Sequence, residues 1–536
     1  MAVNRAAVLT DLQTGNKEFD VIVIGGGITG AGVAREAAGS GLRTLLVEQR
    51  DFAWGTSSRS SKMVHGGLRY LGSGQYRLTR DAVRERQRLM TEAPGLIEPL
   101  RFIMPHFRHQ FPGPGLFQLL LGIYDRIARF RSRQRLTPGE ASLWVPGLTL
   151  DNLTGASGFT DAITDDARLV QRLIAEARRD GAFCMNYVKA LDIERSGGKV
   201  TGVKLQTEED SPPLEVSSPL VINATGVWAD QLQPSSEPSR KMNIRPLRGS
   251  HLVLPWSCLP VSCCVSLFHP DDKRPVFAFP WEGTTVLGTT DLDHSDDLAL
   301  EPAISREEVD YLLKISARLF PGCNVSEENI LSTWAGVRPV VTDGTGKAPS
   351  RESREHEFRE ESGLISIAGG KLTTFRLIAR EALSRGLKHG EATDGLRDQD
   401  QPVFTAAPDI PRPDAIGHRT WNRLKGYYGK DLTQLLACGP LNPVNPSSSG
   451  NDLIWAELYW ACGQEDVQHL DDLLLRRTRL GLIMPDGAQT LLPELRQRCQ
   501  PLLGWDDSRW AREEARYLEI RNQAYALPHG AQNHGI

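Results

Sequence analysis

One stretch near the N-terminus constrains the fold more than any other part of the chain. Residues 20–48 are DVIVIGGGITGAGVAREAAGSGLRTLLVE, an apolar run followed by Gly25-x-Gly27-x-x-Gly30, a helical pattern, a second apolar run and Glu48. A strand, a glycine turn, a helix and an acid about 20 residues on form the arrangement that binds dinucleotides. Gly25 permits the tight turn, Gly27 admits a pyrophosphate, and Gly30 lets the helix pack on the strand. The stretch predicts a Rossmann-like domain, without deciding between a nicotinamide and a flavin.

Composition and charge exclude several classes of protein. The 536 residues suffice for two or three domains. A formal net charge of −4 without a dominant basic tract argues against nucleic acid as a partner. No apolar run reaches the roughly 18–20 residues of a membrane span, and the first 18 residues lack the core of a signal peptide. The eight cysteines are scattered and form no C-x-x-C pair, which indicates reduced thiols in a cytoplasmic protein and predicts no metal site.

A segment rich in hydroxyl groups and glycine follows the acid. Residues 50–71 are RDFAWGTSSRSSKMVHGGLRYL. Such a segment leaves backbone N–H groups free for an anion, and its apolar neighbours indicate partial burial rather than a solvated surface loop. The candidate cofactor-binding residues in it are Thr56, Ser57, Ser58, Ser61, Lys62, His65 and Gly66.

Two later segments repeat the strand and glycine pattern. The run 214–224 leads into Thr225-Gly226, and residues 364–374 are LISIAGGKLTT, followed by a helical pattern to about 388. The carboxyl ends of parallel strands converge on one ligand, and a helix N-terminus there would face it. Further candidates for cofactor binding are therefore Thr225, Gly226, Gly370, Lys371, Leu372 and Thr373.

The spacing of apolar residues predicts a mixed α/β and α+β fold in several parts. Residues 1–18 are expected to be a loose arm. We expect a dinucleotide-binding domain over 19–245 (with some substrate-domain segments around 95–150), an antiparallel substrate-binding sheet over 246–330, a return of the first domain over 331–388, a linker over 389–415 and a C-terminal helical domain over 416–526.

An apolar block at 115–124 is followed by five arginines between 126 and 135. A stretch of this kind can lie on an anionic membrane surface. It can equally be a core helix with a solvated basic end, and the sequence leaves both interpretations open.

Nine motifs, in order along the chain, resemble those of the FAD-dependent, quinone-linked (respiratory) glycerol-3-phosphate dehydrogenases. They are GGGITGAGVAREAAGSGL, TSSRSSKMVHGGLRYL, TDDARLV, NATGVWAD, RGSHLVLP, GTTD, AGVRP, SREH and GGKLTT. The wider family of amine- and hydroxyl-oxidising flavoproteins shares only the glycine and ATG-type motifs. The resemblance is close from residue 19 to about 385 and looser beyond.

The resemblance implies FAD as the cofactor and oxidation of sn-glycerol 3-phosphate to dihydroxyacetone phosphate by hydride transfer to FAD. It places Arg69, Arg338 and Arg354 on the substrate phosphate, since guanidinium groups grip phosphate oxygens bidentately. Tyr70 would add a hydroxyl donor. Lys371 would stabilise negative charge beside the flavin.

The resemblance also implies a base for the substrate hydroxyl, for which an imidazole is suited. We prefer His251 as this base and give His65 an orienting role on the flavin side. The catalytic set is thus His251, His65, Lys371 and Arg338.

The acceptor implied by the resemblance is membrane quinone, which places the protein on the inner face of the cytoplasmic membrane as a peripheral protein; a homodimer is compatible with it. Three alternatives stay open: an oxidase that reduces oxygen, a related flavoenzyme acting on an amine or another hydroxy acid, and a non-catalytic flavin-binding metabolite sensor.

Overall fold

The glycine-rich stretch forms the central strand of a six-stranded sheet. The computed structural model describes residues 5–14, 17–72, 74–207, 211–232, 242–342, 356–387, 395–445 and 452–528. The order of strands in this sheet is β18-β19-β11-β1-β2-β7. Its strands are β1 (Val21–Ile24), β2 (Thr44–Val47), β7 (Phe183–Met185), β11 (Val221–Asn223), β18 (Glu357–Glu361) and β19 (Leu364–Ala368). All are parallel except the edge strand β18.

Three of these parallel strands carry the three predicted glycine turns. β1, β11 and β19 are neighbours in the sheet, although nearly 350 residues separate the first from the last. They are buried because helices cover one face of the sheet, while a small antiparallel sheet and α1 (Arg5–Thr14) cover the other. The predicted convergence of three strand ends is therefore confirmed.

Helix α2 (Ile28–Gly39) lies close against β1 because two glycines remove the intervening side chains. A Cβ atom on Gly30 would lie 1.8 Å from the carbonyl oxygen of Gly25, and Gly25 itself has a φ of +110°. On its other faces α2 packs against α7 (Asp166–Arg179) and α9 (Phe375–Leu387).

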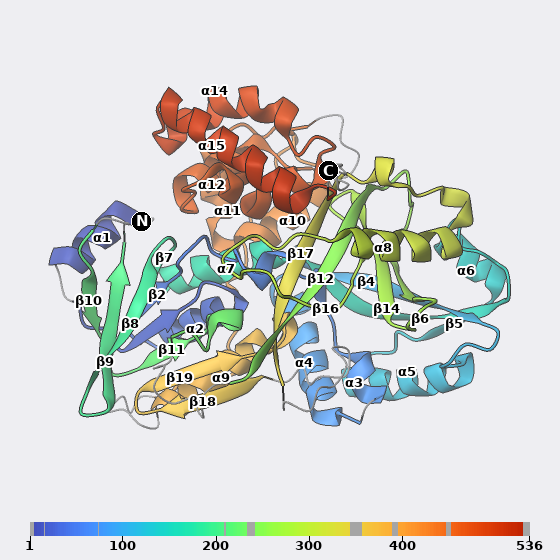
Figure 1. Ribbon diagram of the computed structural model, residues 1–536, viewed down its shortest axis with the longest axis horizontal. Helices are drawn as coiled ribbons and strands as arrows, with labels where there is room; N and C mark the ends of the chain where they lie inside the picture. The colour runs from blue at the N-terminus through green and yellow to red at the C-terminus, as the bar shows by residue number, and fades with distance from the viewer. Residues whose placement is uncertain are drawn as a thin grey trace, which may run out of the picture.

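A second, ten-stranded sheet lies beside the first (Figure 1). Its main path is β16-β12-β15-β14-β13-β4-β6-β3, with β17 paired to β12 and β5 to β6. Its strands are β3 (Met63–Val64), β4 (Ile97–Phe107), β5 (Gln134–Leu136), β6 (Leu153–Thr164), β12 (Ile244–Pro255), β13 (Cys264–Phe268), β14 (Pro275–Trp281), β15 (Thr284–Gly288), β16 (Leu292–Asp293) and β17 (Ser332–Val341). As expected, segments around 95–150 belong to this sheet.

The predicted boundary at 331 is wrong, because β17 belongs to the second sheet. It pairs antiparallel with β12 over ten residues, from Ser332 to Val341. β17 is almost entirely buried, as the strands of parallel sheets also are, so burial does not distinguish the two sheets. Within the described residues the chain re-enters the first sheet at β18.

A small antiparallel sheet and a short helix also differ from the predictions. The sheet contains β8 (Lys189–Ser196), β9 (Lys199–Gln206) and β10 (Leu214–Ser217). The predicted run 214–224 is therefore divided between two sheets, because β10 belongs to the small sheet and β11 to the first. The predicted loose arm contains α1 (Arg5–Thr14), whose Val8 and Leu12 are buried in the same cluster as this sheet.

The remaining helices cover the second sheet and form the C-terminal domain. The first group contains α3 (Leu68–Gly72), α4 (Tyr76–Glu92), α5 (Pro114–Ala128), α6 (Pro138–Trp144) and α8 (Arg306–Leu319). The C-terminal group contains α10 (His418–Tyr428), α11 (Leu432–Cys438), α12 (Trp455–Gln464), α13 (Leu480–Ile483), α14 (Leu492–Leu503) and α15 (Asp507–Ile520). Figure 1 shows the C-terminal group above both sheets. None of the described helices combines the length and apolar character needed to cross a bilayer.

The segment before the C-terminal helices is irregular but packed. Val403 and Phe404 are buried with α2 and α9, and Nε of Arg35 donates to the carbonyl oxygen of Val403 at 2.9 Å. The predicted linker, in its described part from 395 onward, therefore holds the helical domain against the first sheet.

The substitution Gly30→Ala tests the close approach of α2. The new methyl group meets backbone rather than a flexible side chain, so α2 must shift, and we expect a loss of about 2 kcal/mol in the free energy of unfolding. Urea denaturation followed by circular dichroism measures it. The matched control is Gly463→Ala in α12, where a Cβ meets nothing within 4 Å and should stabilise by about 0.5 kcal/mol. Equal effects at both positions would contradict the packing argument.

Candidate active site

A cavity of about 350 Å³ opens at the carboxyl ends of β1, β11 and β19. The three glycine turns supply much of its wall: Gly25, Gly27, Ala224, Thr225, Gly226, Gly369 and Gly370. Gly226, Gly369 and Gly370 have positive φ values, a conformation that favours glycine. The turns therefore expose backbone to the cavity, which is the surface that a pyrophosphate group requires.

Glu48 lines the same cavity with its carboxylate held in place. Its Oε2 accepts from the backbone N–H of Gly26 at 2.7 Å, and Oε1 accepts from that of Arg50 at 2.9 Å. Burial raises the pKa of Glu48, while these two donors act in the opposite direction. The fixed carboxylate can accept further hydrogen bonds from the hydroxyl groups of a ribose.

Two tryptophans on the cavity wall are not predicted from the sequence. The rings of Trp54 and Trp228 lie 6.0 Å apart, and the guanidinium of Arg50 lies 4.1 Å above Trp54. An aromatic residue next to Gly55, just beyond the dinucleotide-binding acid, is the signal that could have indicated Trp54. The pair offers flat surfaces to a ligand ring.

A second cavity, of about 710 Å³, adjoins the first. The two share a wall formed by Thr56, Ser60, Pro339, Gly369, Gly370, Lys371 and Leu372. Most of the second cavity is apolar, with Phe102, Met104, Phe117, Phe159 and Phe277 in its lining. Its polar lining includes hydroxyl groups and the titratable side chains His65, Tyr70, Asp161, Arg338 and Lys371.

Arg338 reaches the second cavity from β17 and is held by two partners. Its Nη2 donates to Oγ1 of Thr289 at 2.9 Å, and Nη1 donates to Oδ1 of Asp291 at 3.1 Å. The side chain is 22% exposed. A Cβ on Gly249, in the paired strand β12, would lie 2.2 Å from Nη2, so only glycine leaves room for the guanidinium.

Three side chains form a column along another part of this wall. The Nζ of Lys371 lies 3.5 Å from the centroid of the Tyr70 ring, and that ring stacks on His65 with centroids 6.5 Å apart. Oγ1 of Thr373 donates to the backbone carbonyl of His65 at 3.2 Å. The segment 65–70 and the glycine turn after β19 are thereby joined at the second cavity.

His251 lies behind the wall rather than on it. It is 1% exposed, stacks on Trp334 at 4.9 Å, and lines neither cavity in the described structure. Its Nε2 lies 2.9 Å from Oγ of Ser61, which does line the second cavity. Burial lowers the pKa of His251 well below its ordinary value, and the charges of Arg338 and Lys62 act in the same direction. The imidazole is therefore neutral near pH 7.

The structure is incompatible with ligand contacts for two residues predicted to bind the cofactor. Lys62 is fully buried, with Nζ donating to Oδ1 of Asp166 at 2.8 Å and to the carbonyl of Ser58 at 2.7 Å. The backbone at Lys62 has a φ of +59°, and burial of the ammonium lowers its pKa to about 8 despite Asp166. Ser58 is buried beside it, and neither residue lines a described cavity.

Two predicted glycines have packing roles. The Cβ of an alanine at Gly66 would lie 2.2 Å from the hydroxyl of Tyr124, and Gly30 lies against Gly25 as described above. Other predicted residues line one or both cavities: Gly25, Gly27, Glu48, Thr56, Ser57, Ser61, His65, Tyr70, Thr225, Gly226, Arg338, Gly370, Lys371, Leu372 and Thr373. Arg354 and the side chain of Arg69 lie outside the described part of the chain.

The chain matches two family models that together cover most of its length. Residues 20–382 match the model described as FAD dependent oxidoreductase. Residues 384–510 match the one described as C-terminal domain of alpha-glycerophosphate oxidase.

Named relatives match between 71% and 96% of the chain. Glycerol-3-phosphate dehydrogenase 2 of Mycobacterium bovis is 33% identical over 96% of this chain and 90% of its own length. The aerobic glycerol-3-phosphate dehydrogenase of Staphylococcus haemolyticus is 38% identical over 71% of this chain and 68% of its own length. The crystal structure of the glycerol-3-phosphate dehydrogenase from Bacillus halodurans, complexed with FAD, superimposes with a TM-score of 0.72 at 25% identity, covering 97% of each chain.

The substitution Glu48→Gln tests the first cavity. An amide in place of the carboxylate presents an N–H group to a backbone donor, so we expect the dissociation constant for FAD to rise about tenfold. Flavin fluorescence titration measures it. Glu215→Gln, an exposed change on β10 away from the cavities, serves as the control and should leave the constant unchanged. Equal FAD affinities in all three proteins would show that the carboxylate does not contact the ligand.

Proposed function

Because the chain belongs to the FAD-dependent glycerol-3-phosphate dehydrogenase family, we propose that it oxidises sn-glycerol 3-phosphate to dihydroxyacetone phosphate. The observation that carries the proposal is the junction of the two cavities. A wall suited to a dinucleotide adjoins a largely apolar chamber whose lining includes the cations Arg338 and Lys371. A phosphate monoester with a small alcohol matches this combination of apolar lining and positive charge.

FAD is the cofactor, and the first cavity fits its adenine and pyrophosphate half. Glu48 is placed to hold the ribose. The glycine turns and the N-terminus of α2 are placed to hold the pyrophosphate. Oγ of Ser57 accepts from the N–H of Ile28 at 2.9 Å and fixes this end of the helix. When bound, FAD supplies the hydride acceptor.

We assign the substrate phosphate to Arg338 and Lys371. The fork of Arg338 is fixed by Asp291 and Thr289, so little conformational freedom is lost when it grips a phosphate. The apolar remainder of the chamber excludes water and strengthens the attraction between these cations and the dianion. Arg69 and Arg354 stay candidates for the same role.

We assign the role of the base that takes up the proton of the substrate hydroxyl to His65, not to His251. His65 lines the chamber, whereas His251 reaches it only through Ser61. The burial and the two cations that keep His251 neutral also oppose its taking up a proton. His251 then orients Ser61 by a hydrogen bond.

We propose that the electrons pass to a membrane quinone and that the protein lies on the inner face of the cytoplasmic membrane. The support is the apolar surface around α5, on the side away from the C-terminal helices (Figure 1). Phe111, Leu119 and Phe130 are 80%, 62% and 55% exposed. Phe111 and Leu116 also line the second cavity, so the exposed surface continues into the chamber. Oxygen is the competing acceptor, favoured by the match of the C-terminal region to the oxidase domain.

The activity is tested by the colour of the purified protein. The yellow protein should bleach when glycerol 3-phosphate is added without oxygen, and stopped-flow mixing should then show faster recovery of colour with a quinone analogue than with oxygen. Failure to bleach would favour the sensor or a different substrate. Faster recovery with oxygen would make the protein an oxidase.

The substitution Arg338→Lys tests the phosphate site. Lysine keeps the positive charge but lacks the planar guanidinium that can donate two parallel hydrogen bonds to a phosphate. We therefore expect KM for glycerol 3-phosphate to rise about 10- to 100-fold, with a smaller change in kcat. Steady-state kinetics with a quinone analogue measures both. Arg245→Lys is the control, since Arg245 also forms a fork on an aspartate, Asp293, but lines neither cavity. An unchanged KM in the Arg338 variant would contradict the assignment of Arg338 to the substrate phosphate.

The two histidines can be separated by His65→Asn and His251→Asn. Loss of a general base costs about 10²- to 10⁴-fold in kcat, so we expect this loss in the His65 variant, together with loss of the acid limb of the pH–rate profile. The His251 variant should lose less of its kcat and keep the acid limb of the pH–rate profile. The reverse order would restore His251 as the base.

Membrane attachment through α5 is tested by Leu119→Asp. A charge in place of an exposed leucine should lower binding to anionic lipid vesicles at least about tenfold. Vesicle flotation at low salt measures it, and the control is Leu502→Asp on α14, another exposed leucine (46%) in the C-terminal domain, which should leave the binding unchanged. If the unchanged protein does not float with the vesicles, the membrane proposal is wrong.

A further inference from the structure

Three buried arginines connect the C-terminal domain to the segment that lines both cavities. Arg476 and Arg477 end a single π-helical turn, Asp472–Arg477, and Arg479 precedes α13. All three are at most 5% exposed. Besides partners within their own domain, they bond to the segment after Glu48 and to the TDDARLV motif, which the catalytic assignments leave unexplained.

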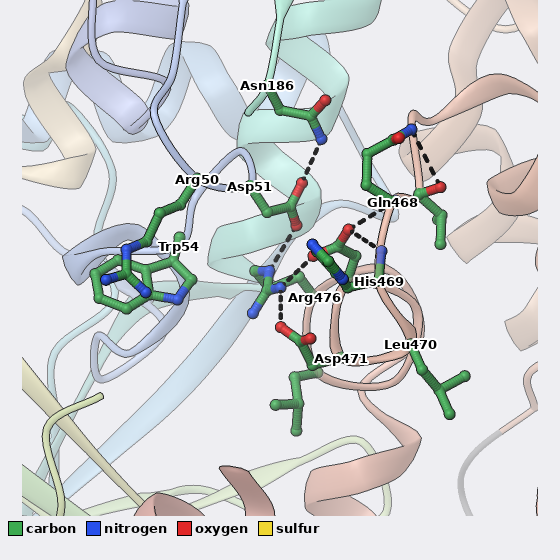
Figure 2. A network of polar contacts seen from close by, with 12 residues as sticks. Arg50, Asp51, Trp54, Asn186, Gln468, His469, Leu470, Asp471 and Arg476 are labelled. Atoms are coloured by element: carbon green, nitrogen blue, oxygen red, sulfur yellow. Dashed lines mark hydrogen bonds and ion pairs between the residues drawn. The ribbon is translucent and has the colours of Figure 1, made fainter. Parts of the chain in front are cut away.

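The first partner is Asp51, three residues after Glu48. Arg477 grips it bidentately, with Nη1 to Oδ2 and Nη2 to Oδ1 both 2.7 Å. Nε of Arg476 donates to Oδ2 at 2.5 Å, and Nδ2 of Asn186 donates to Oδ1 at 2.9 Å (Figure 2). Burial alone would raise the pKa of Asp51, but Arg477 and Arg476 lower it to about 2. The aspartate is thus ionised and fully bonded in the interior.

Asp51 starts a turn that returns to the glycine loop. The N–H of Trp54 donates to the carbonyl of Asp51, and the N–H of Ala53 donates to the carbonyl of Gly26, both at 3.0 Å. The Trp54 ring then lines the first cavity, with Nε1 donating to Oε1 of Glu301 at 2.7 Å. Arg477 is therefore connected to the first cavity through one carboxylate and one tight turn.

The second connection runs through the TDDARLV motif to the shared wall. Nε and Nη2 of Arg479 donate to the two carboxylate oxygens of Asp165 at 2.9 and 3.0 Å, and Nη2 donates to Oδ1 of Asp166 at 2.5 Å. Oδ2 of Asp166 accepts from both the N–H and the hydroxyl of Ser60, at 2.9 and 2.7 Å. Ser60 lines both cavities.

A third connection joins the end of the chain to the same segment. The hydroxyl of Tyr525 donates to Oε2 of Glu301 at 2.8 Å and accepts from Nε of Arg59 at 3.1 Å. The C-terminal domain thus holds the segment 51–60 directly at Asp51 and Arg59, and through Asp166 at Ser60.

We propose that Arg477 and Arg479 are positioning residues for the FAD site, and that FAD binding is thermodynamically linked to docking of the C-terminal domain. A buried carboxylate that loses its partner is costly, because water cannot replace the partner. Movement of either arginine therefore displaces the backbone that carries Trp54 and Ser60. By linkage, FAD that holds this backbone in turn stabilises the docked arginines.

The test uses the full-length variants Arg477→Lys and Arg479→Lys. Lysine keeps the charge but cannot make several directed bonds from one planar group. We expect the dissociation constant for FAD to rise at least about tenfold in each, with altered flavin absorption bands. Arg496→Lys, at an exposed pair with Asp507 in the same domain, is the control and should match the unchanged protein. Unchanged FAD affinity and spectrum in folded variants with a lowered melting temperature would overturn the proposal.

Hydrogen exchange on the unchanged protein decides the case in which the variants do not fold. Removal of FAD should increase amide exchange in 472–483 as well as in the glycine loop. An increase confined to the glycine loop would overturn the proposed linkage. Both measurements require FAD and no alcohol, so their outcome is independent of the proposed substrate.

Discussion

Parallel pairing of β1, β11 and β19 is the constraint on which the rest of this structure depends. Each strand ends in a turn that needs glycine, and the sheet brings those turns together from positions hundreds of residues apart. The close contact between Gly25 and Gly30 sets α2 against the first of them, so the helix N-terminus also faces the cavity. The backbone of all three turns lines the cavity, where a ligand can approach it closely.

The second sheet contributes what backbone groups alone cannot supply, namely a chamber lined by charged side chains that are held in fixed positions. β17 brings Arg338 to the wall while β12, its partner, contributes a glycine that makes room for the guanidinium. Positive charge is distributed unequally around the chamber. Lys62 is neutralised by Asp166 in the interior, whereas Arg338 and Lys371 reach the lining. The apolar floor makes those two cations effective, since few other polar groups compete for an anion there.

The spacing of residues within short stretches of the sequence predicted those elements of the fold that depend only on neighbouring residues. The strand–glycine–helix units and the glycine turns of the first cavity follow from spacing and residue type, whereas Arg338 and Tyr70 were placed at the site only by the family resemblance. Ser58 and Lys62 could not be separated from their cavity-lining neighbours, because the direction of Lys62 depends on a positive φ and on Asp166, 104 residues away. His251 was similarly ambiguous, since its burial depends on Trp334. β17 was assigned to the wrong sheet because a strand buried on both faces has the same composition in either sheet.

The second cavity continues into the apolar surface beside α5, and this continuity affects the order in which reactants can bind during a turnover. Phe111 and Leu116 belong at once to the lining and to the apolar surface beside α5. A lipid-soluble acceptor that arrives from this surface would cross the space in which the small phosphate ester binds. The two reactants would then exclude one another, and oxidised product would have to leave before the acceptor enters. Such a chamber favours alternating half-reactions, with the protein storing two electrons between the departure of one molecule and the arrival of the next.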